Sequence, residues 1–192
     1  TDGIFGLNAG DTLFMRGPYG NAFPVEQFEG KDLVVICGGT GMAPVLTMIN
    51  HFYDHPEVCK SVNLISGFKN ADAVLFRDEI EKFRARFNVI TTLDNEVVEG
   101  FETGMVTAHI SKIPIRSFDD YNIVIVGPPV MMHFAALECE KNGAEDSKIW
   151  VSFERKMCCG VGKCGHCKIN DTYVCLEGPV FNYSVAKDKL MD

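Results

Sequence analysis

Short apolar runs alternate with longer segments of mixed apolar and charged residues through most of the chain. Five of these runs have the length and continuous apolar character of strands covered on both faces of a sheet, and they are residues 33–37, 62–66, 89–93, 123–126 and 149–153. The segments between them predict helices at residues 45–52, 75–87, 105–110 and 130–142. Strands that alternate with helices build a parallel sheet with right-handed crossovers. The sequence therefore predicts an α/β fold with a doubly wound, parallel five-stranded sheet.

The first 30 residues follow a different pattern, because turn residues interrupt them repeatedly. Gly10-Asp11, Gly17-Pro18 and Glu29-Gly30 are typical turn pairs, and the apolar pieces between them are as short as residues 12–15. This pattern predicts one or two strands with loops, which is too little to bury a core. We therefore expect residues 1–30 to be the last edge of a domain whose remainder is absent, and the first residue, Thr1, agrees with this expectation.

Composition narrows the classes of protein further. The 192 residues are 46% hydrophobic and 23% charged, which is typical of a folded globular chain. Lys and Arg number 18 against 26 Asp and Glu, so the net charge of −8 argues against electrostatic binding of nucleic acid. No apolar run approaches the ~18 residues of a membrane span, and no signal segment opens the chain. We therefore expect a cytoplasmic protein with no membrane partner.

A glycine-rich turn follows the first predicted strand and is the first candidate ligand site. Glycines let a backbone approach a phosphate closely, and the next helix N-terminus favours an anion. The turn lacks the Gly-Lys-Ser/Thr of a P-loop, and Pro44 stands where a G-x-G-x-x-G motif has its third glycine. A purely structural turn therefore remains an alternative. The candidate nucleotide-binding residues here are Gly38, Gly39, Thr40, Gly41, Met42, Ala43 and Pro44.

A second candidate loop follows the fourth predicted strand. In doubly wound sheets, ligands bind outside the carboxyl ends of the strands, at the point where the strand order reverses. If the first and fourth strands are neighbours there, their loops face each other across one crevice, although paired prolines also occur as simple loop ends. The candidates from this loop and from the end of the second strand are Gly127, Pro128, Pro129, Met131, Gly67 and Phe68. Lys69 could bind a 2′-phosphate and Asp72 a 2′-hydroxyl, so NADH and NADPH both stay open.

The cysteines give the most specific pattern in the chain. Five of the eight lie between residues 158 and 175. Their C-x4-C-x2-C spacing, followed by a fourth Cys, is the pattern of a plant-type [2Fe–2S] centre, here with a short x7 return to the fourth ligand. Nearby glycines can expose N–H groups to the sulfurs. The predicted ligands are Cys159, Cys164, Cys167 and Cys175. A structural zinc site is the alternative, because C-x2-C alone suits tetrahedral zinc. We expect the scattered Cys37, Cys59 and Cys139 to be small buried hydrophobes.

Three loop motifs resemble those of the ferredoxin–NADP reductase superfamily. Residues 39–44 and 127–132 resemble its two nicotinamide-site motifs, and residues 17–20 resemble the turn that ends its flavin barrel. Many members carry Cys before Gly-Pro-Pro, where this chain has Val126. The resemblance therefore does not imply thiol-assisted hydride transfer in this chain. The resemblance implies a reductase-type NAD domain at residues 31–153, a remnant of the FAD-binding barrel at 1–30, and a small C-terminal [2Fe–2S] subdomain at 154–192.

Two segments of the tail resemble the B subunits of anaerobic sulfite reductases, namely residues 150–167 and 173–181. Sulfhydrogenase gamma subunits and dihydroorotate dehydrogenase electron-transfer subunits are related to that family. The Cys158-Cys159 doublet, Lys163 and Gly165-His166 favour the sulfite reductase group. The resemblance implies electron flow from NADH, or from NADPH, through FAD to the cluster. Iron–sulfur and sirohaem partner subunits would then reduce sulfite to sulfide. It also implies an FAD site mostly outside this sequence and no catalytic acid–base side chain.

Two alternatives to this function remain at the level of the sequence. The same electron-transfer role could serve a hydrogenase or a dihydroorotate dehydrogenase. The chain could instead be a non-catalytic nucleotide-binding module whose cysteines hold a structural zinc ion.

Overall fold

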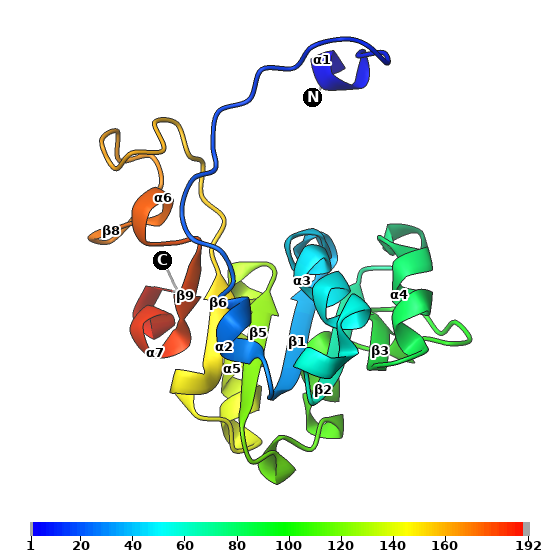
Figure 1. The fold of residues 1–192 in the computed structure, drawn as a ribbon. Helices are drawn as coiled ribbons and strands as arrows, with labels where there is room; N and C mark the ends of the chain where they lie inside the picture. The colour runs from blue at the N-terminus through cyan, green and yellow to red at the C-terminus, as the bar shows by residue number, and fades with distance from the viewer. Residues whose placement is uncertain (1, 190–192) are drawn as a thin grey trace.

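The computed structural model describes residues 2–189, and a seven-stranded sheet forms its centre (Figure 1). The strand order is β4-β3-β2-β1-β5-β6-β9. All five predicted strands are present, and each pairs in parallel with its neighbour among them. They are β1 (Asp32–Gly38), β2 (Ser61–Phe68), β3 (Asn88–Leu93), β5 (Tyr121–Val126) and β6 (Ile149–Ser152). The predicted doubly wound α/β fold is therefore confirmed.

Two strands of the sheet were not predicted. β4 (Glu102–Thr103) adds a parallel edge to β3, and β9 (Val180–Asn182) pairs antiparallel with β6. Both are too short for an apolar period to reveal them. The β9 pairing returns the end of the chain to the main sheet, so the cysteine-rich segment leaves and rejoins the sheet at adjacent strands.

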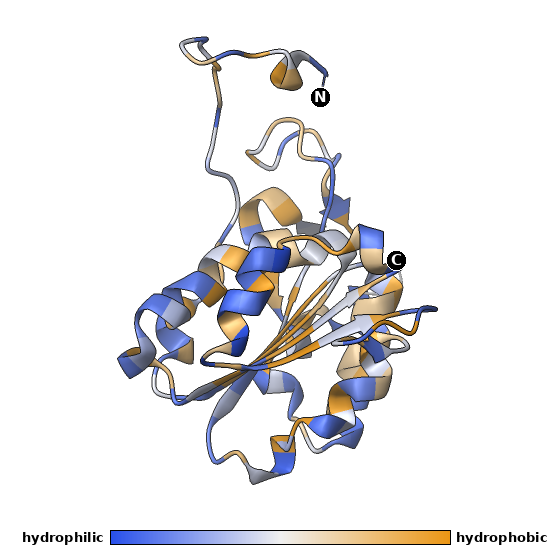
Figure 2. Ribbon diagram, turned by 90° about the vertical axis from the view of Figure 1, so that its right-hand side faces the viewer, coloured by the Kyte–Doolittle hydropathy of each residue, from blue (hydrophilic) through white to orange (hydrophobic). Residues whose placement is uncertain are grey.

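Helices cover both faces of the sheet. The predicted helices correspond to α3 (Met42–Asp54), α4 (Arg77–Arg84), α5 (Pro129–Lys141) and a 3-10 helix at Val106–Lys112. Alternate strand residues bury toward opposite faces: Leu33 and Val35 pack in the cluster that includes α3 and α4, whereas Val34 and Ile36 pack in the cluster that includes α5. Figure 2 shows apolar residues along the strands and helices of mixed polarity around them.

Shorter elements complete the described chain. The helices are α1 (Asp2–Phe5), α2 (Val25–Phe28), α6 (Val174–Glu177) and α7 (Tyr183–Ala186), and the strands β7 (Lys168–Ile169) and β8 (Thr172–Tyr173) form a separate two-stranded sheet. Single 3-10 turns lie at Gly39–Gly41, Pro56–Val58, Ala71–Ala73, Ile115–Ser117, Asp146–Lys148 and Lys187–Lys189. Within residues 2–189, no helix has both the length and the apolar character needed to span a bilayer.

The N-terminal segment differs from its prediction. Residues 2–31 contain α1 and α2 but no strand, so the expected one or two strands are wrong. A strand needs a hydrogen-bonded partner, and the segment instead extends away from the sheet, with Phe14 and Met15 exposed (Figure 1). It rejoins the domain at α2, where Phe28 is fully buried against the Trp150 ring at a centroid distance of 6.0 Å.

Candidate functional site

The two predicted ligand loops meet at the carboxyl ends of β1 and β5. β1 lies between β2 and β5, so the strand order reverses there, and the first and fourth predicted strands are neighbours. A Cβ on Gly41 would lie only 2.3 Å from the Val126 carbonyl oxygen, which means that no larger residue fits between the loops without a shift. Met131 packs against both Gly38 and Gly127. The loops therefore form the walls of a crevice at the topological switch point.

A cavity of about 630 Å³ lies on one side of the loop after β5. Six of the predicted nucleotide-site residues line it, namely Gly38, Gly39, Gly67, Phe68, Pro128 and Met131. Asp94, Met105, Phe134 and Glu138 also line it and were missed by sequence reasoning. Asp94 follows β3 directly, so the rule that ligands bind at strand carboxyl ends could have found it. The cavity size suits part of a dinucleotide.

The charges in this cavity keep both nicotinamide cofactors open. Lys69 lines the cavity as the predicted cation, but the acidic lining residues are Asp94 and Glu138. Asp72, the predicted acid, lies in the 3-10 turn at Ala71–Ala73, exposed to solvent. Glu138 is itself paired with Lys141, whose ammonium lies 2.6 Å from its carboxylate. The acid for a 2′-hydroxyl would therefore come from the end of β3 rather than from the turn after β2.

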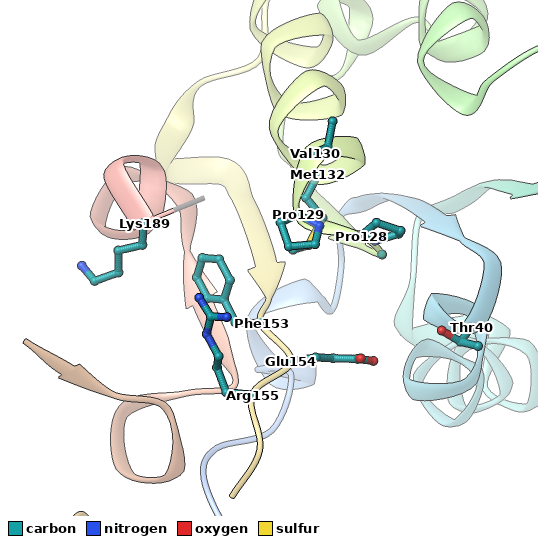
Figure 3. Close-up of a pocket in the computed structure, with 10 residues that line it drawn as sticks. Thr40, Pro128, Pro129, Val130, Met132, Phe153, Glu154, Arg155 and Lys189 are labelled. Carbon is teal, nitrogen blue, oxygen red and sulfur yellow. The ribbon is translucent and has the colours of Figure 1, made fainter. Parts of the chain in front are cut away.

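A second cavity of about 350 Å³ lies on the other side of the same loop (Figure 3). Thr40, Gly127, Pro128 and Pro129 line it from the two predicted loops. Phe153, Glu154 and Arg155, which follow β6, line the opposite wall together with Lys189. In Figure 3 the Glu154 side chain extends across the cavity toward Thr40. Sequence reasoning missed this wall because β6 was assigned only as a strand.

Four predicted site residues line neither cavity. Gly41 and Met42 are buried beneath the first loop, where the Met42 sulfur lies 3.5 Å from the Cys37 thiol. Ala43 and Pro44 are exposed in the first turn of α3, where the helix dipole favours an anion. These residues therefore shape the loop or present its solvent side rather than line the crevice.

The cysteine loop directs backbone N–H groups at two of its sulfurs. The Cys159 sulfur accepts hydrogen bonds from the amides of Val161, Lys163 and Cys164 at 3.4–3.5 Å. These bonds favour the thiolate and lower the pKa of the Cys159 thiol to about 6. Gly162, held at φ +67°, donates its amide to the Cys175 sulfur at 3.3 Å. The expected exposure of N–H groups by the glycine-rich loop is thus present.

The four predicted ligands interact in two pairs. Cys164 contributes to the lowered pKa of the Cys159 thiol, and burial together with Cys167 raises the pKa of the Cys175 thiol, so Cys159 neighbours Cys164 and Cys175 neighbours Cys167. Within residues 2–189, no three His, Cys, Asp or Glu side chains are placed to hold a single metal ion. A two-iron cluster with four cysteine ligands places two on each iron, so two thiol pairs with amides around them fit such a cluster.

The scattered cysteines have no part in this loop. Burial raises the pKa of the Cys37 and Cys139 thiols to about 12, which confirms both as buried hydrophobes. Cys59 is only partly buried, and its thiol donates to the carbonyls of Lys31 and Ser61. Its pKa is raised to about 11, chiefly by burial.

Comparison with known proteins assigns the chain to a family. Residues 35–136 match the family described as oxidoreductase NAD-binding domain, and residues 154–185 match the iron–sulfur cluster binding domain of dihydroorotate dehydrogenase B. The gamma subunit of sulfhydrogenase 2 from Pyrococcus furiosus is 36% identical over 94% of this chain and 68% of its own length. The chain belongs to the oxidoreductase NAD-binding domain family. The two matches follow one another along the chain, an NAD-binding domain and then an iron–sulfur cluster binding domain.

Other similar proteins agree with this assignment. A probable electron-transfer subunit of dihydroorotate dehydrogenase B from Methanothermobacter thermautotrophicus is 32% identical over 94% of this chain and 63% of its own length. An NADH-dependent reduced ferredoxin-NADP oxidoreductase has a similar fold, with a TM-score of 0.72, at 24% identity over 98% of this chain and 67% of that chain. The chain thus spans about two thirds of these proteins. The relatives named here are hydrogenase and dihydroorotate dehydrogenase subunits, so they do not support the narrower resemblance to sulfite reductase.

Proposed function

We propose that this chain is an electron-transfer subunit that carries electrons from NADH or NADPH, through FAD, to a [2Fe–2S] cluster and on to a partner subunit. The observation that carries the proposal is the cysteine loop, with two thiol pairs and four backbone amides aimed at the Cys159 and Cys175 sulfurs. Cys159, Cys164, Cys167 and Cys175 would hold the cluster. The match of residues 154–185 to an iron–sulfur binding domain supports the same assignment.

Each part of the chain has a distinct task in this proposal. The loops after β1 and β5 would bind the nicotinamide nucleotide in the crevice, with Lys69 and Asp94 at its rim. Phe153, Glu154 and Arg155 form the wall that connects the crevice to the cysteine loop. When bound, the flavin would accept a hydride and release single electrons. The side chains of this chain bind and orient the cofactors and exclude water, and no acid–base side chain is required.

The domain organisation is proposed on the same basis. Residues 31–153 would bind the nucleotide, residues 154–192 the cluster, and residues 1–30 would be the end of a flavin-binding domain that holds FAD mostly outside this sequence. We also propose a cytoplasmic location, because eight free thiols suit a reducing compartment.

The partner is proposed from the relatives. Similar proteins include sulfhydrogenase and dihydroorotate dehydrogenase subunits, so the catalytic partner would be a hydrogenase or a dihydroorotate dehydrogenase. A second candidate is a sulfite reductase with iron–sulfur and sirohaem subunits. It is favoured by the Cys158-Cys159 doublet, Lys163 and Gly165-His166.

Metal analysis tests the cluster assignment. Protein purified anaerobically should contain about two irons and about two acid-labile sulfides per chain, with an EPR signal after reduction. Cys159→Ser and Cys175→Ser should lose the signal, whereas the neighbouring Cys158→Ser should keep it. Stoichiometric zinc without sulfide would contradict the proposal and favour the nucleotide-binding module with a structural metal.

Partner identity needs a separate experiment. The complex isolated under anaerobic conditions from its source should oxidise NADH or NADPH with one of three acceptors: protons, the oxidised pyrimidine orotate, or sulfite. Hydrogen or dihydroorotate formation would identify the partner class of the relatives. Sulfide formation would instead establish the second candidate.

A further inference from the structure

Residues 16–21 of the N-terminal segment lie against the cysteine loop, more than 130 positions away in the sequence. The Arg16 guanidinium donates hydrogen bonds to the carbonyls of Cys158 and Cys159 at 3.2 and 3.1 Å. Figure 1 shows this extended segment running beside the loop between β6 and α6. The contact therefore fixes the peptide that carries the first predicted cluster ligand.

Tyr19 strengthens this contact. Its ring covers Gly160, the residue after the first ligand, so closely that a Cβ on Gly160 would lie 2.5 Å from the ring. The Arg16 guanidinium also lies over the Tyr19 ring, with its carbon 5.4 Å from the ring centroid. Arg16 and Tyr19 thus hold residues 158–160 from the outside.

The same segment also holds the far end of the loop. The Asn21 amide donates to the Gly178 carbonyl at 2.6 Å, and its side chain donates to the Glu177 carbonyl at 2.8 Å. The Val180 amide donates to the Asn21 side-chain oxygen at 3.0 Å. Because Cys175 lies two residues before Glu177, residues 16–21 are bonded next to both the first and the last predicted ligand.

The positive charge of Arg16 indicates a second role besides holding the cysteine loop in place. Within residues 2–189, Arg16 forms no ion pair with a carboxylate, and its hydrogen bonds go to the two ligand-region carbonyls. Its positive charge is therefore not neutralised locally. Reduction of an iron–sulfur cluster adds negative charge, and nearby cations and hydrogen bonds favour the reduced form.

We propose that Arg16 is a positioning residue for the cysteine loop and that its charge raises the reduction potential of the cluster. This inference rests on the proposed function, since it assumes the [2Fe–2S] site. It assigns to the N-terminal segment a role in tuning the electron acceptor as well as in linking two parts of the fold.

Redox titration of the complete protein, purified anaerobically, tests the role of Arg16. Arg16→Gln should shift the midpoint potential of the cluster to a more negative value, because it removes the charge. Arg16→Lys should keep a potential close to that of the unchanged protein, because it keeps the charge. Both variants should release iron to a chelator severalfold faster, since neither places the guanidinium nitrogen Nη2 where it donates to the Cys158 and Cys159 carbonyls.

Arg86→Gln provides the matched control. Arg86 also donates to a backbone carbonyl, that of Tyr53 at 2.6 Å, and lies over the Tyr53 ring at 4.7 Å. This variant makes the same charge change far from the cysteines, so its potential and its iron release should be unchanged. The titration reports only loaded molecules, so partial loss of iron in Arg16→Gln does not obscure the potential.

The outcomes separate the two proposals. A cluster whose potential is the same in Arg16→Gln and in the unchanged protein would overturn the role of Arg16 while leaving the electron-transfer function intact. An unchanged protein that holds no iron would overturn the proposed function, and this inference with it. Equal shifts in Arg16→Gln and Arg86→Gln would show a nonspecific effect of net charge and would also overturn the proposal.

Discussion

Gly41 is the residue at which the nucleotide crevice is most tightly constrained. The carbonyl of Val126 occupies the space where a side chain would begin, because the loops after β1 and β5 approach each other there. Sequence reasoning identified the glycine-rich turn but assigned a ligand contact to Gly41. The residue is buried and lets the two loops meet, and its contact with a nucleotide stays a prediction.

Gly41→Ala should therefore destabilise the fold and weaken nucleotide binding. The added methyl group overpacks the junction, at a cost of about 1–3 kcal/mol in the free energy of unfolding. Urea denaturation and titration with NADH measure the two effects. Gly3→Ala is the control, because a Cβ at Gly3 meets no atom within 4 Å. Equal stability of the two variants would contradict the interpretation.

The buried thiols of Cys37 and Cys139 predict how alkylation and stability of the protein depend on pH. Their thiols should resist alkylation in the folded protein at pH 8, because burial raises their pKa values to about 12. The unfolded chain ionises near its ordinary value of 9.0, so stability should fall as pH rises from about 9 toward 12. Mass spectrometry of peptides from labelled protein checks the first point, and urea midpoints across this range check the second. Rapid labelling of either thiol before unfolding would show that burial is not maintained.

The elements that the sequence predicts best are those with long apolar runs. β1 and β5 are buried along nearly their whole length, so their continuous apolar character was sufficient to find them. β9 has only three residues and depends on β6 for its pairing, which no local pattern reveals. The prediction of N-terminal strands was wrong because a strand-like apolar sequence is not enough without a partner. Apolar residues there, such as Phe14, pair with no strand in the described chain.

α2 illustrates an element that tertiary packing sustains. It has four residues, and no side chain caps its N-terminus, so it is too short to persist alone. Phe28→Ala should cost about 3–5 kcal/mol, because it empties a fully buried site beside Trp150. Phe14→Ala makes the same change at a ring that is 93% exposed and should leave the urea midpoint unchanged. Similar losses in both variants would argue against this account of α2.

At the scale of the whole molecule, ion pairs connect the 3-10 turn after α7 with α5 and with the turn before β6. The Lys187 ammonium lies 2.8 Å from Glu140 on α5 and 3.0 Å from Asp146. These carboxylates raise the pKa of Lys187, while the neighbouring Glu140 and the pairing with Lys187 lower the pKa of Asp146. The network therefore connects the end of the chain with the helix that borders the crevice.

The lowered pKa of Asp146 predicts an acid-sensitive contribution to stability. This contribution is present above the ordinary carboxyl pKa of 3.8 and is lost as pH falls through the lower folded value. Lys187→Gln should thus be less stable than the unchanged protein at pH 7, and the difference should shrink below about pH 4. Lys189→Gln is the control, because among residues 2–189 the Lys189 ammonium bonds only the Val185 carbonyl. A difference independent of pH would contradict an ionic origin. Thermal unfolding at several pH values makes the measurement.

The antiparallel pairing of β6 with β9 has a consequence for the evolution of this fold. The cysteine-rich segment is one long excursion between hydrogen-bonded neighbours, so both of its ends emerge about 5 Å apart. The entropy of closing an excursion grows slowly with its length. Evolution can therefore insert, delete or replace the segment between β6 and β9 as one unit, and the order of the other strands in the sheet stays the same. The β6–β9 edge of the sheet is therefore a position where different inserted segments could follow the same nucleotide-binding fold.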